Sequence, residues 1–196
     1  MIARRMYRHR VNTLKELGDT PEHEGIEFDL RSDGMRTIVT HDPFTDGPTI
    51  DEFFASIGPR PCIFNVKCEG IEGCVMNAAA RFGITDYFFL DLSVPAAAKL
   101  ASKGERRFAV RYSEWEPVES VLAWKGTAQW VWVDCFHAYP GDAATWARLS
   151  GDFRLCIVSP ELQGHGVERI GAERANLSGR AFHAVCSKRP DLWGDR

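Results

Sequence analysis

The sequence has no long apolar run and no excess of basic residues, and these two absences exclude several classes of protein. No stretch approaches the roughly 20 apolar residues of a membrane span, and the N-terminal residues lack the apolar core of a signal peptide. We therefore expect a cytoplasmic protein without a transmembrane segment. The 24 basic and 27 acidic residues give a net charge of -3, so bulk charge does not indicate nucleic-acid binding. An anionic ligand must be held by local groups.

Cysteine pairs of the C-x-x-C type are also absent, although the chain contains six cysteines. Cys62, Cys156 and Cys186 lie in apolar, strand-like runs, which predicts buried free thiols rather than a zinc site. Cys68 and Cys74 are close enough in sequence to form a bridge. The expected reducing compartment disfavours that disulfide.

Repeats, linkers and low-complexity segments are lacking as well, so nothing in the sequence divides the chain. The composition is 44% hydrophobic and 26% charged, which is ordinary for a globular protein. A length of 196 residues predicts a single domain, residues 1–196, with a sizeable core. Trp130, Trp132 and Trp146 are predicted to pack in that core. The oligomeric state is left open.

Apolar runs rich in β-branched and aromatic residues alternate with helix-like segments along the chain, as in a parallel sheet built from βα units. The predicted strands are residues 4–9, 25–30, 62–66, 87–92, 108–111, 130–134, 153–158 and 182–186. The predicted helices are residues 50–57, 73–82, 95–103, 117–124, 142–149 and 167–177. Eight strands with crossovers predict the α/β class and, within it, a compact (β/α)8 TIM barrel.

A Gly-rich phosphate loop after the first strand is missing, which disfavours the rival fold, an open doubly wound sheet. Such barrels typically have about 250 residues, so this shorter chain is expected to have short or partly missing helices. Residues 33–34 form an Asp-Gly turn that is followed by Thr-Ile-Val-Thr at 37–40. This pattern predicts a β-hairpin inserted after the second strand.

Polar side chains gather where the predicted strands end, which is the face that carries the active site in barrels of this class. They are His9, Glu27, Asp29, His41, Asn65, Lys67, Asp91, Arg111, Asp134 and Glu161. The loops after strands four to eight mix these ionic groups with aromatic residues. Such a lining suits a sugar or polyol phosphate, so Asp91, Arg111, Asp134 and Glu161 are candidates for the substrate pocket.

Glu27 and Asp29 are two residues apart on a strand, so their side chains share one face, which in a barrel is the interior. Two carboxylates pointing inward need a cation, and Mg²⁺ or Ca²⁺ is commonly held by such oxygens. The alternative is an exposed strand edge, with Ile26, Phe28 and Leu30 forming the buried face.

His9 and His41 together suggest acid and base catalysis. A phosphodiester is cleaved when water or an internal hydroxyl attacks phosphorus, while one imidazole takes a proton and another supplies one to the leaving oxygen. A metal and a nearby cation stabilise charge on the phosphoryl oxygens.

Several of these segments resemble the glycerophosphodiester phosphodiesterase family. They are His9 with Arg10, residues 25–30 (Gly-Ile-Glu-Phe-Asp-Leu), residues 33–34 (Asp-Gly) and residues 41–43 (His-Asp-Pro). Residues 65–67 (Asn-Val-Lys) resemble the family's third-strand Glu-Ile-Lys, and residues 186–191 resemble its closing Thr-Asp-x-Pro segment. The resemblance implies a phosphodiesterase barrel of lipid metabolism, in the superfamily of phosphatidylinositol-specific phospholipases C and spider-venom phospholipases D.

The resemblance also implies residue roles. Residues matching His9 and His41 act as acid and base in that family, those matching Glu27 and Asp29 bind the divalent metal, and Arg10 and Lys67 would contact the phosphate. The sequence departs from the family where Val11 replaces a glycine, where residues 12–13 shorten a Pro-Glu-Asn-Thr segment, and where Asn65 replaces the third metal carboxylate. A neutral amide at this position weakens metal binding.

Two other functions remain open from the sequence. In the first, Lys67 forms a Schiff base with a carbonyl substrate, as in a lyase or aldolase. In the second, the barrel binds a phosphorylated sugar or lipid head group without turnover, because Asn65 has replaced a carboxylate. The favoured function is a metal-dependent phosphoric diester hydrolase that acts on a small glycerophosphodiester-like or sugar-linked diester.

Overall fold

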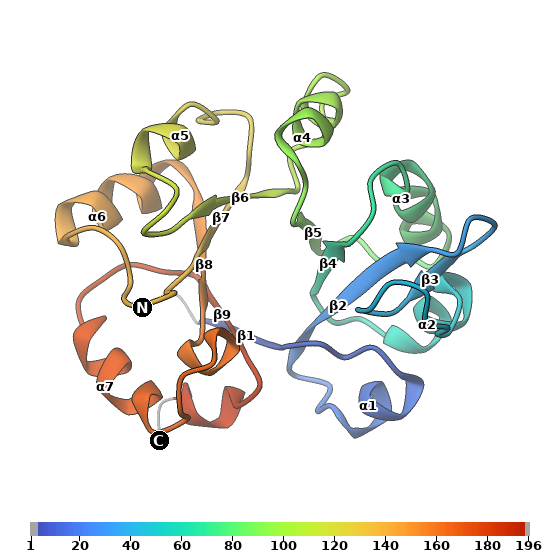
Figure 1. The fold of residues 1–196 in the computed structure, drawn as a ribbon, viewed down its shortest axis with the longest axis horizontal. Coiled ribbons are helices and arrows are strands. Elements are labelled where there is room, and N and C mark those ends of the chain that lie inside the picture. The colour runs from blue at the N-terminus through green and yellow to red at the C-terminus, as the bar shows by residue number, and fades with distance from the viewer. Residues whose placement is uncertain (1–3, 195–196) are drawn as a thin grey trace.

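The computed structural model describes residues 4–194. In this range eight parallel strands form an almost closed ring, and helices cover its outer side (Figure 1). The barrel strands are β1 (Arg5–Arg8), β2 (Gly25–Ser32), β4 (Cys62–Val66), β5 (Tyr87–Leu90), β6 (Ala109–Tyr112), β7 (Trp130–Val133), β8 (Arg154–Val158) and β9 (Ala184–Ser187). Their spatial order is β5, β4, β2, β1, β9, β8, β7, β6. The predicted (β/α)8 barrel is therefore confirmed.

The helices between the strands are short, as the length of the chain predicts. They are α1 (Leu14–Asp19), α2 (Ile50–Ile57), α3 (Glu72–Arg81), α4 (Val94–Ala101), α5 (Val118–Leu122), α6 (Ala143–Asp152) and α7 (Arg169–Asn176), with 3-10 turns η1 (Pro160–Gln163) and η2 (Pro190–Leu192). The longest of these, α3 and α6, have 10 residues each. Among the described residues, no helix has both the length and the apolarity needed to cross a bilayer.

Strand β2 shows why the carboxylates enter the barrel. Ile26, Phe28 and Leu30 are buried on its outer side, where the ring of Phe28 lies 4.9 Å from that of Phe53 on α2. Since alternate residues point to opposite faces, Glu27 and Asp29 point into the barrel. The alternative of an exposed strand edge is wrong, because both faces of the strand are buried.

The predicted hairpin is confirmed as well. Strand β3 (Thr37–Val39) pairs antiparallel with the end of β2, with Leu30 opposite Val39 and Ser32 opposite Thr37. At the other end of β2, Gly25 allows β1 to approach closely, because an added Cβ would lie 2.6 Å from the ring of Tyr7. Such a contact is far inside van der Waals distance, so only glycine fits there.

Aromatic side chains fill the interior of the barrel below the polar residues. Phe88 stacks on Trp130 with ring centroids 4.5 Å apart, and Tyr7 meets Phe88 edge-on at 6.1 Å. The tryptophans at positions 130, 132 and 146 are buried, as predicted. This apolar layer closes one end of the barrel and confines polar chemistry to the other.

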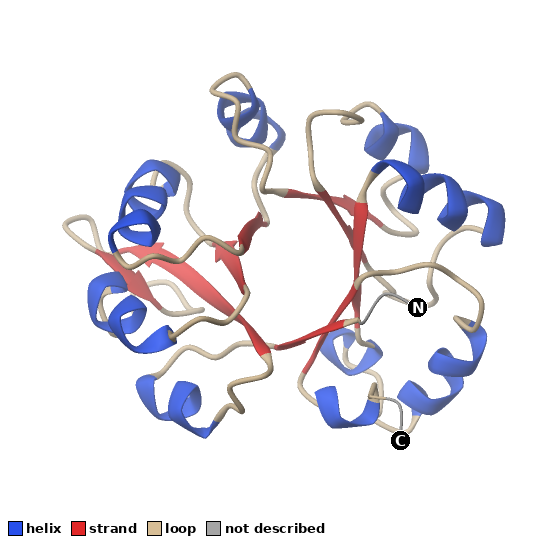
Figure 2. Cartoon of the chain, turned by 180° about the vertical axis from the view of Figure 1, so that it is seen from behind, coloured by secondary structure: helices blue, strands red, loops and turns tan. Residues whose placement is uncertain are grey.

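The backbone pairing of the ring is weakest between β5 and β6. These neighbours share only one isolated parallel bridge in the described residues, Phe89 with Phe108, whereas β2 and β4 are in register from Ile26 to Leu30. Helix α4 also stands apart from the other helices at this point (Figure 2). We call this place the β5/β6 seam.

One helix of the structure is missing from the sequence predictions, whereas the cysteine predictions are confirmed. Helix α1 was not predicted, although Thr13 and Glu16 form a capping box at its start, a recognised signal for the beginning of a helix. All six cysteines are free, so Cys68 and Cys74 form no bridge. Cys62, Cys156 and Cys186 are buried thiols, as predicted.

Candidate active site

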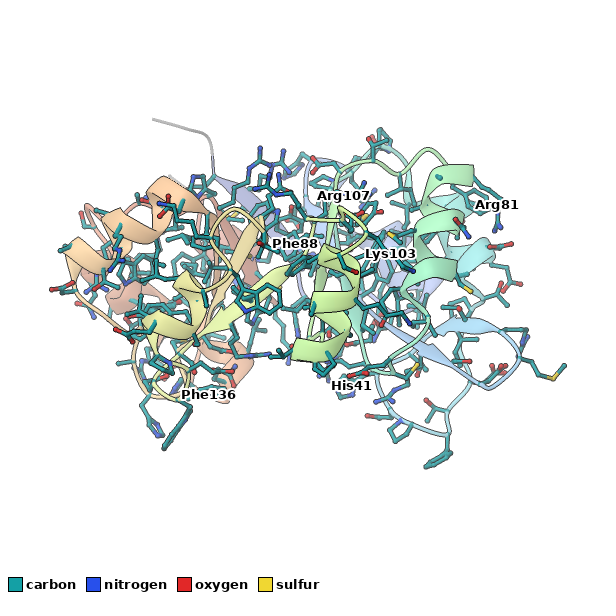
Figure 3. All side chains as sticks on the ribbon, turned by 90° about the horizontal axis from the view of Figure 1, so that it is seen from above. His41, Arg81, Phe88, Lys103, Arg107 and Phe136 are labelled. Carbon is teal, nitrogen blue, oxygen red and sulfur yellow. The ribbon has the colours of Figure 1, made fainter. Side chains whose placement is uncertain are left out.

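The candidate site lies at the carboxyl ends of the first strands. In a view across the barrel, His41 and Phe136 lie at one edge, Arg107 lies at the opposite edge, and Phe88 lies between them (Figure 3). His41 follows the hairpin and Phe136 follows β7, whereas Arg107 precedes β6. Figure 3 therefore separates the face that carries the polar residues from the face where strands begin.

Glu27 and Asp29 form the centre of the site. Their exposed fractions are 0% and 1%, and both come from the inward face of β2. Burial raises the pKa of Glu27, and the charge of Asp29 raises it further. A carboxylate resists burial beside a second carboxylate unless cations or hydrogen-bond donors compensate, so the partners of the pair decide its chemistry.

Two protein donors hold Glu27. The amide Nδ2 of Asn65 donates to Oε1 at 2.7 Å, and the backbone N–H of Arg10 donates to Oε2 at 2.6 Å. Arg10 has a left-handed φ of 58°, which is rare for a residue with a side chain. This conformation turns the backbone N–H after β1 towards the carboxylate, and such strain is typical of functional sites.

Asp29 is held by a different set of groups. Its Oδ2 accepts a hydrogen bond from Asn12 Nδ2 at 2.8 Å, and its backbone N–H donates to Asn12 Oδ1 at 2.9 Å. Lys67 Nζ lies 3.5 Å from Asp29 Oδ1, and Arg10 Nε lies 3.9 Å from Oδ2. The sequence analysis places Asn12 in a shortened loop and predicts no role for it. Its position three residues after His9, at the end of the first strand, is the signal that points to a place in the site.

His9 lies against Glu27. Its Nε2 is 3.6 Å from Glu27 Oε2, and its side chain is 16% exposed. Burial lowers the pKa of His9 to about 3, and the positive charges of Arg10, Lys188 and Lys67 act in the same direction. The imidazole is therefore neutral at neutral pH. Its Nδ1 is buried and has no hydrogen-bond partner among the described residues.

His41 has the opposite surroundings. It is more exposed, and its Nδ1 lies 2.7 Å from Asp42 Oδ1. This hydrogen bond lowers the pKa of Asp42, so Asp42 accepts and His41 Nδ1 donates. Arg31 donates to the carbonyl of His41 at 2.8 Å and to that of Lys67 at 3.1 Å. Arg31 thereby fixes the hairpin loop beside the end of β4.

The oxygen atoms around Glu27 are suitable for a divalent cation. Oδ1 of Asn65 is buried and has no hydrogen-bond partner within residues 4–194, and it lies next to two buried carboxylates. An orphaned buried oxygen is costly unless a ligand satisfies it. Oxygen donors of this kind fit Mg²⁺ or Ca²⁺. Among the described residues there is no cluster of three His, Cys, Asp or Glu side chains with metal-binding geometry, so a cation at this place would need a donor of another kind, such as Asn65 Oδ1, beside the two carboxylates.

A chain of alternating charges leads from this centre to the β5/β6 seam. Lys67 donates to Asp91 at 2.8 Å, and Arg111 then pairs with both Asp91 and Asp134. Gln163 donates to the second oxygen of Asp134, which is completely buried. Burial raises the pKa of Asp134, although Arg111 acts against this shift. The structure thus connects Lys67, which is predicted to contact the phosphate, with three of the predicted pocket residues, Asp91, Arg111 and Asp134.

Glu161 lies on another side of the ring. One of its oxygens accepts hydrogen bonds from Ser187 Oγ at 2.6 Å and from the backbone N–H of Lys188 at 2.9 Å. Ser159 Oγ donates to the other oxygen and accepts from Trp193 Nε1 at 2.7 Å. Glu161 therefore ties the loop after β8 to the end of β9, and it does not join the charges around Asp91.

The fold and the polar cluster define a (β/α)8 barrel with a carboxylate and histidine site. Among solved structures, the chain is similar to a protein from Agrobacterium tumefaciens assigned to the glycerophosphoryl diester phosphodiesterases. That match has a TM-score of 0.72 and 15% identity, and it covers 96% of this chain and 95% of that chain. A glycerophosphoryl diester phosphodiesterase from Parabacteroides distasonis matches with a TM-score of 0.67 and 12% identity, over 97% of this chain and 85% of that chain.

No protein-family model matches the sequence, and a search of curated proteins finds no match. At identities of 15% and 12%, the structural likeness establishes the fold. The chain has the fold of these phosphodiesterase structures, and the family resemblance predicted from the sequence segments is supported at that level.

Proposed function

We propose that the chain is a metal-dependent phosphoric diester hydrolase, formed as a single barrel domain, that acts on a glycerophosphodiester or a sugar- or polyol-linked diester. The observation that carries this function is the buried pair Glu27 and Asp29, with the neutral imidazole of His9 only 3.6 Å from Glu27. The barrel likeness to glycerophosphoryl diester phosphodiesterases supports the same conclusion.

The two histidines differ in a way that suits opposite roles. His9 is kept neutral by burial and by nearby cations, which is the protonation state that a general base for the attacking water or internal hydroxyl needs. His41, whose Nδ1 donates to Asp42, supplies a proton to the leaving alcohol oxygen. One new P–O bond forms while the ester P–O bond breaks, and the proton lost by the nucleophile is matched by the proton given to the leaving group.

The cationic side chains position the substrate. Lys67 and Arg10 lie within 4 Å of Asp29 oxygens, and they would hold the phosphoryl oxygens beside the carboxylate pair. Glu27, Asp29 and Asn65 would hold a Mg²⁺ or Ca²⁺ ion. When bound, such an ion stabilises negative charge on the phosphoryl oxygens.

Binding without turnover is the second candidate. The observation that favours it is the hydrogen bond from Asn65 Nδ2 to Glu27, because it replaces part of the charge compensation that a metal would give. The Schiff-base alternative has less support. Lys67 forms an ion pair with Asp91 at 2.8 Å and lies 3.5 Å from Asp29, an arrangement suited to an ammonium, whereas that chemistry requires a neutral amine.

A panel of diesters tests the proposed function. Purified protein would be incubated with glycerophosphocholine, glycerophosphoethanolamine and sugar-linked diesters, with Mg²⁺, Ca²⁺ or EDTA, and products would be followed by ³¹P NMR. We expect a phosphomonoester or cyclic phosphate to appear only with metal, and His41→Ala to abolish it. His23→Ala, an exposed histidine away from the site, should have no effect.

Two other outcomes decide between the candidates. Stabilisation by a phosphorylated ligand without any product, in the presence of both metals, would favour the binding protein. An adduct trapped by borohydride and lost in Lys67→Arg would favour the Schiff-base lyase.

A further inference from the structure

The loop after β1 continues along the edge of β2 beyond the point where the strand pairing ends. The parallel register of β1 with β2 extends only as far as Ile26. Further along, the backbone N–H of Val11 donates to the carbonyl of Glu27 at 2.9 Å. The backbone N–H of Asp29 then donates to the side chain of Asn12 at 2.9 Å. The loop thus takes the place of a strand beside the two buried carboxylates.

The side chain of Asn12 holds Asp29 at two points. Its Oδ1 accepts the hydrogen bond from the backbone N–H of Asp29 at 2.9 Å, and its Nδ2 donates to the carboxylate Oδ2 at 2.8 Å. One planar amide therefore contacts both the backbone and the carboxylate of the same residue. A change in the position of Asn12 must shift the direction in which the Asp29 carboxylate points.

Helix α1 in turn holds Asn12. The carboxylate Oε2 of Glu16 accepts hydrogen bonds from the backbone N–H of Asn12 at 2.9 Å and from that of Thr13 at 3.0 Å. The hydroxyl of Thr13 accepts from the backbone N–H of Glu16 at 3.1 Å, which completes the capping box. The box therefore extends one residue beyond the helix cap, to the residue that holds Asp29.

The capping box of α2 has the same chemistry without this extension. Glu52 accepts from the backbone N–H of Thr49 at 2.8 Å, and the hydroxyl of Thr49 accepts from the backbone N–H of Glu52 at 3.3 Å. The residue before this cap is Pro48, which has no backbone N–H to donate. The box of α2 involves only the cap and the helix, so it supplies a matched control.

We propose that Asn12 and Glu16 are positioning residues for Asp29, through which the start of α1 sets the direction of a carboxylate in the candidate site. Neither residue acts on the substrate: Glu16 orients Asn12, and Asn12 orients Asp29. The inference rests on the proposed function for the metal that Asp29 would hold, and it deepens that function by adding two residues outside the carboxylate pair.

The metal affinity of the protein tests this assignment. Outer hydrogen-bond partners of metal ligands typically contribute about 10- to 100-fold to affinity, so Asn12→Ala should raise the Kd for Mg²⁺ or Ca²⁺ by this factor in a calorimetric titration. Glu16→Ala should raise the Kd less, because Asn12 itself remains. Glu16→Gln should keep the wild-type Kd, since its amide oxygen still accepts both N–H groups. This variant separates the hydrogen bonds from the charge.

Glu52→Ala is the matched control. It removes a capping box of the same kind, so its loss of melting temperature should be similar to that of Glu16→Ala, while its Kd for the metal stays at the wild-type value. Glu16 is exposed, so Glu16→Ala decides the question even where Asn12→Ala does not fold. An unchanged Kd in Glu16→Ala, or an equal rise in Glu16→Ala and Glu52→Ala, would overturn the inference.

Amide hydrogen exchange separates failure of this inference from failure of the proposed function. Exchange reports the local opening of hydrogen bonds and needs no metal. We expect the Asp29 amide to lose its protection in Asn12→Ala, to exchange faster in Glu16→Ala and to be unchanged in Glu52→Ala. This pattern in a protein that binds neither Mg²⁺ nor Ca²⁺ would preserve the positioning role and refute the metal-dependent hydrolase. Metal binding with an Asp29 amide equally protected in every variant would do the reverse.

Discussion

The two sides of the barrel differ in how they are closed. On one side, β1 pairs with β9 from Arg5 to Arg8, and β2 pairs with β4 over five positions. On the other side, β5 and β6 share one bridge within the described chain, and the contact is completed by Arg111 between Asp91 and Asp134. Backbone hydrogen bonds close the first side, whereas charged side chains close the second.

This difference in closure matches a difference in the residues that the two sides carry. The side closed by backbone pairing carries Glu27, Asp29 and His9, and the proposed proton transfer and metal binding would require their positions to be held closely. The seam carries a cavity of about 710 Å³ and the ion pairs of Arg111. Strands paired through their backbones thus carry the proposed chemistry, whereas the seam is closed mainly by side chains.

The largest expected effect is a loss of kcat from a substitution on the side that carries Glu27, Asp29 and His9. His9→Ala should lower kcat by about 10²- to 10⁴-fold, the range for loss of a general acid or base. Asp134→Asn at the seam should lower kcat by less than about tenfold, because Asp134 is remote from phosphorus and only supports Arg111. Steady-state kinetics on glycerophosphocholine would test the contrast. Equal losses in the two variants would contradict the placement of the chemistry on that side.

The next largest effect concerns the ion pairs of Arg111 with Asp91 and Asp134, which we call the clasp of the seam. Arg111→Met leaves the buried carboxylate of Asp134 without its cation, and should lower the free energy of unfolding by about 3 kcal/mol or more. Arg81→Met is the matched control, because Arg81 pairs with Asp51 at the surface, with side chains 57% and 59% exposed. Urea unfolding should show a loss of less than about 1 kcal/mol for the control. Similar losses would mean that the clasp does not close the seam.

A third change tests the close packing of the rigid side. Gly25→Ala places a methyl group 2.6 Å from the Tyr7 ring and 2.9 Å from the Pro61 carbonyl, so it should cost about 1 to 3 kcal/mol. Gly18→Ala in α1 meets nothing within 4 Å. That change should be neutral or stabilising by up to about 1 kcal/mol. Thermal unfolding of the two variants would show whether β1 and β2 need this contact.

The smallest effect is a pH dependence that originates in His9. Its pKa is lowered to about 3 in the folded protein from about 6.5 in the unfolded chain, so the unfolded chain binds the proton first as the pH falls. The stability from a neutral His9 is present above pH 6.5 and is lost as the pH falls towards 3, by up to about 1.4 kcal/mol per pH unit.

His9→Asn should flatten the curve of unfolding free energy against pH between about 6.5 and 4 relative to the wild type. His23→Asn is the control, because that residue is exposed. A slope that is unchanged in His9→Asn would show that the buried imidazole takes up a proton as readily as an exposed one.

Much of the fold was predictable because it depends on local patterns. Alternation along β2 placed Glu27 and Asp29 on the face opposite Phe28, and the Asp33-Gly34 turn indicated the hairpin. The capping box at Thr13 and Glu16 is an equally local signal, and it marks the start of α1. Strand ends shifted by one or two residues, as hydrogen-bonded boundaries commonly do.

Other features were not predictable because they depend on contacts between distant segments. The two hydrogen bonds between Asn12 and Asp29 require the loop after β1 to fold over β2. The pairing of Arg111 with Asp91 and Asp134 requires β5, β6 and β7 to be neighbours in the assembled barrel. Such packing follows from the assembled barrel and has no signature in a single sequence.

The most direct test of the proposed chemistry is hydrolysis of glycerophosphocholine after removal of metal with EDTA and return of Mg²⁺ or Ca²⁺, in the wild type and in Glu27→Gln. We predict activity in the wild type that disappears with EDTA, returns with the metal, and is absent from a folded Glu27→Gln protein. Activity that persists in EDTA or in Glu27→Gln would contradict a metal-dependent diesterase centred on the buried carboxylates.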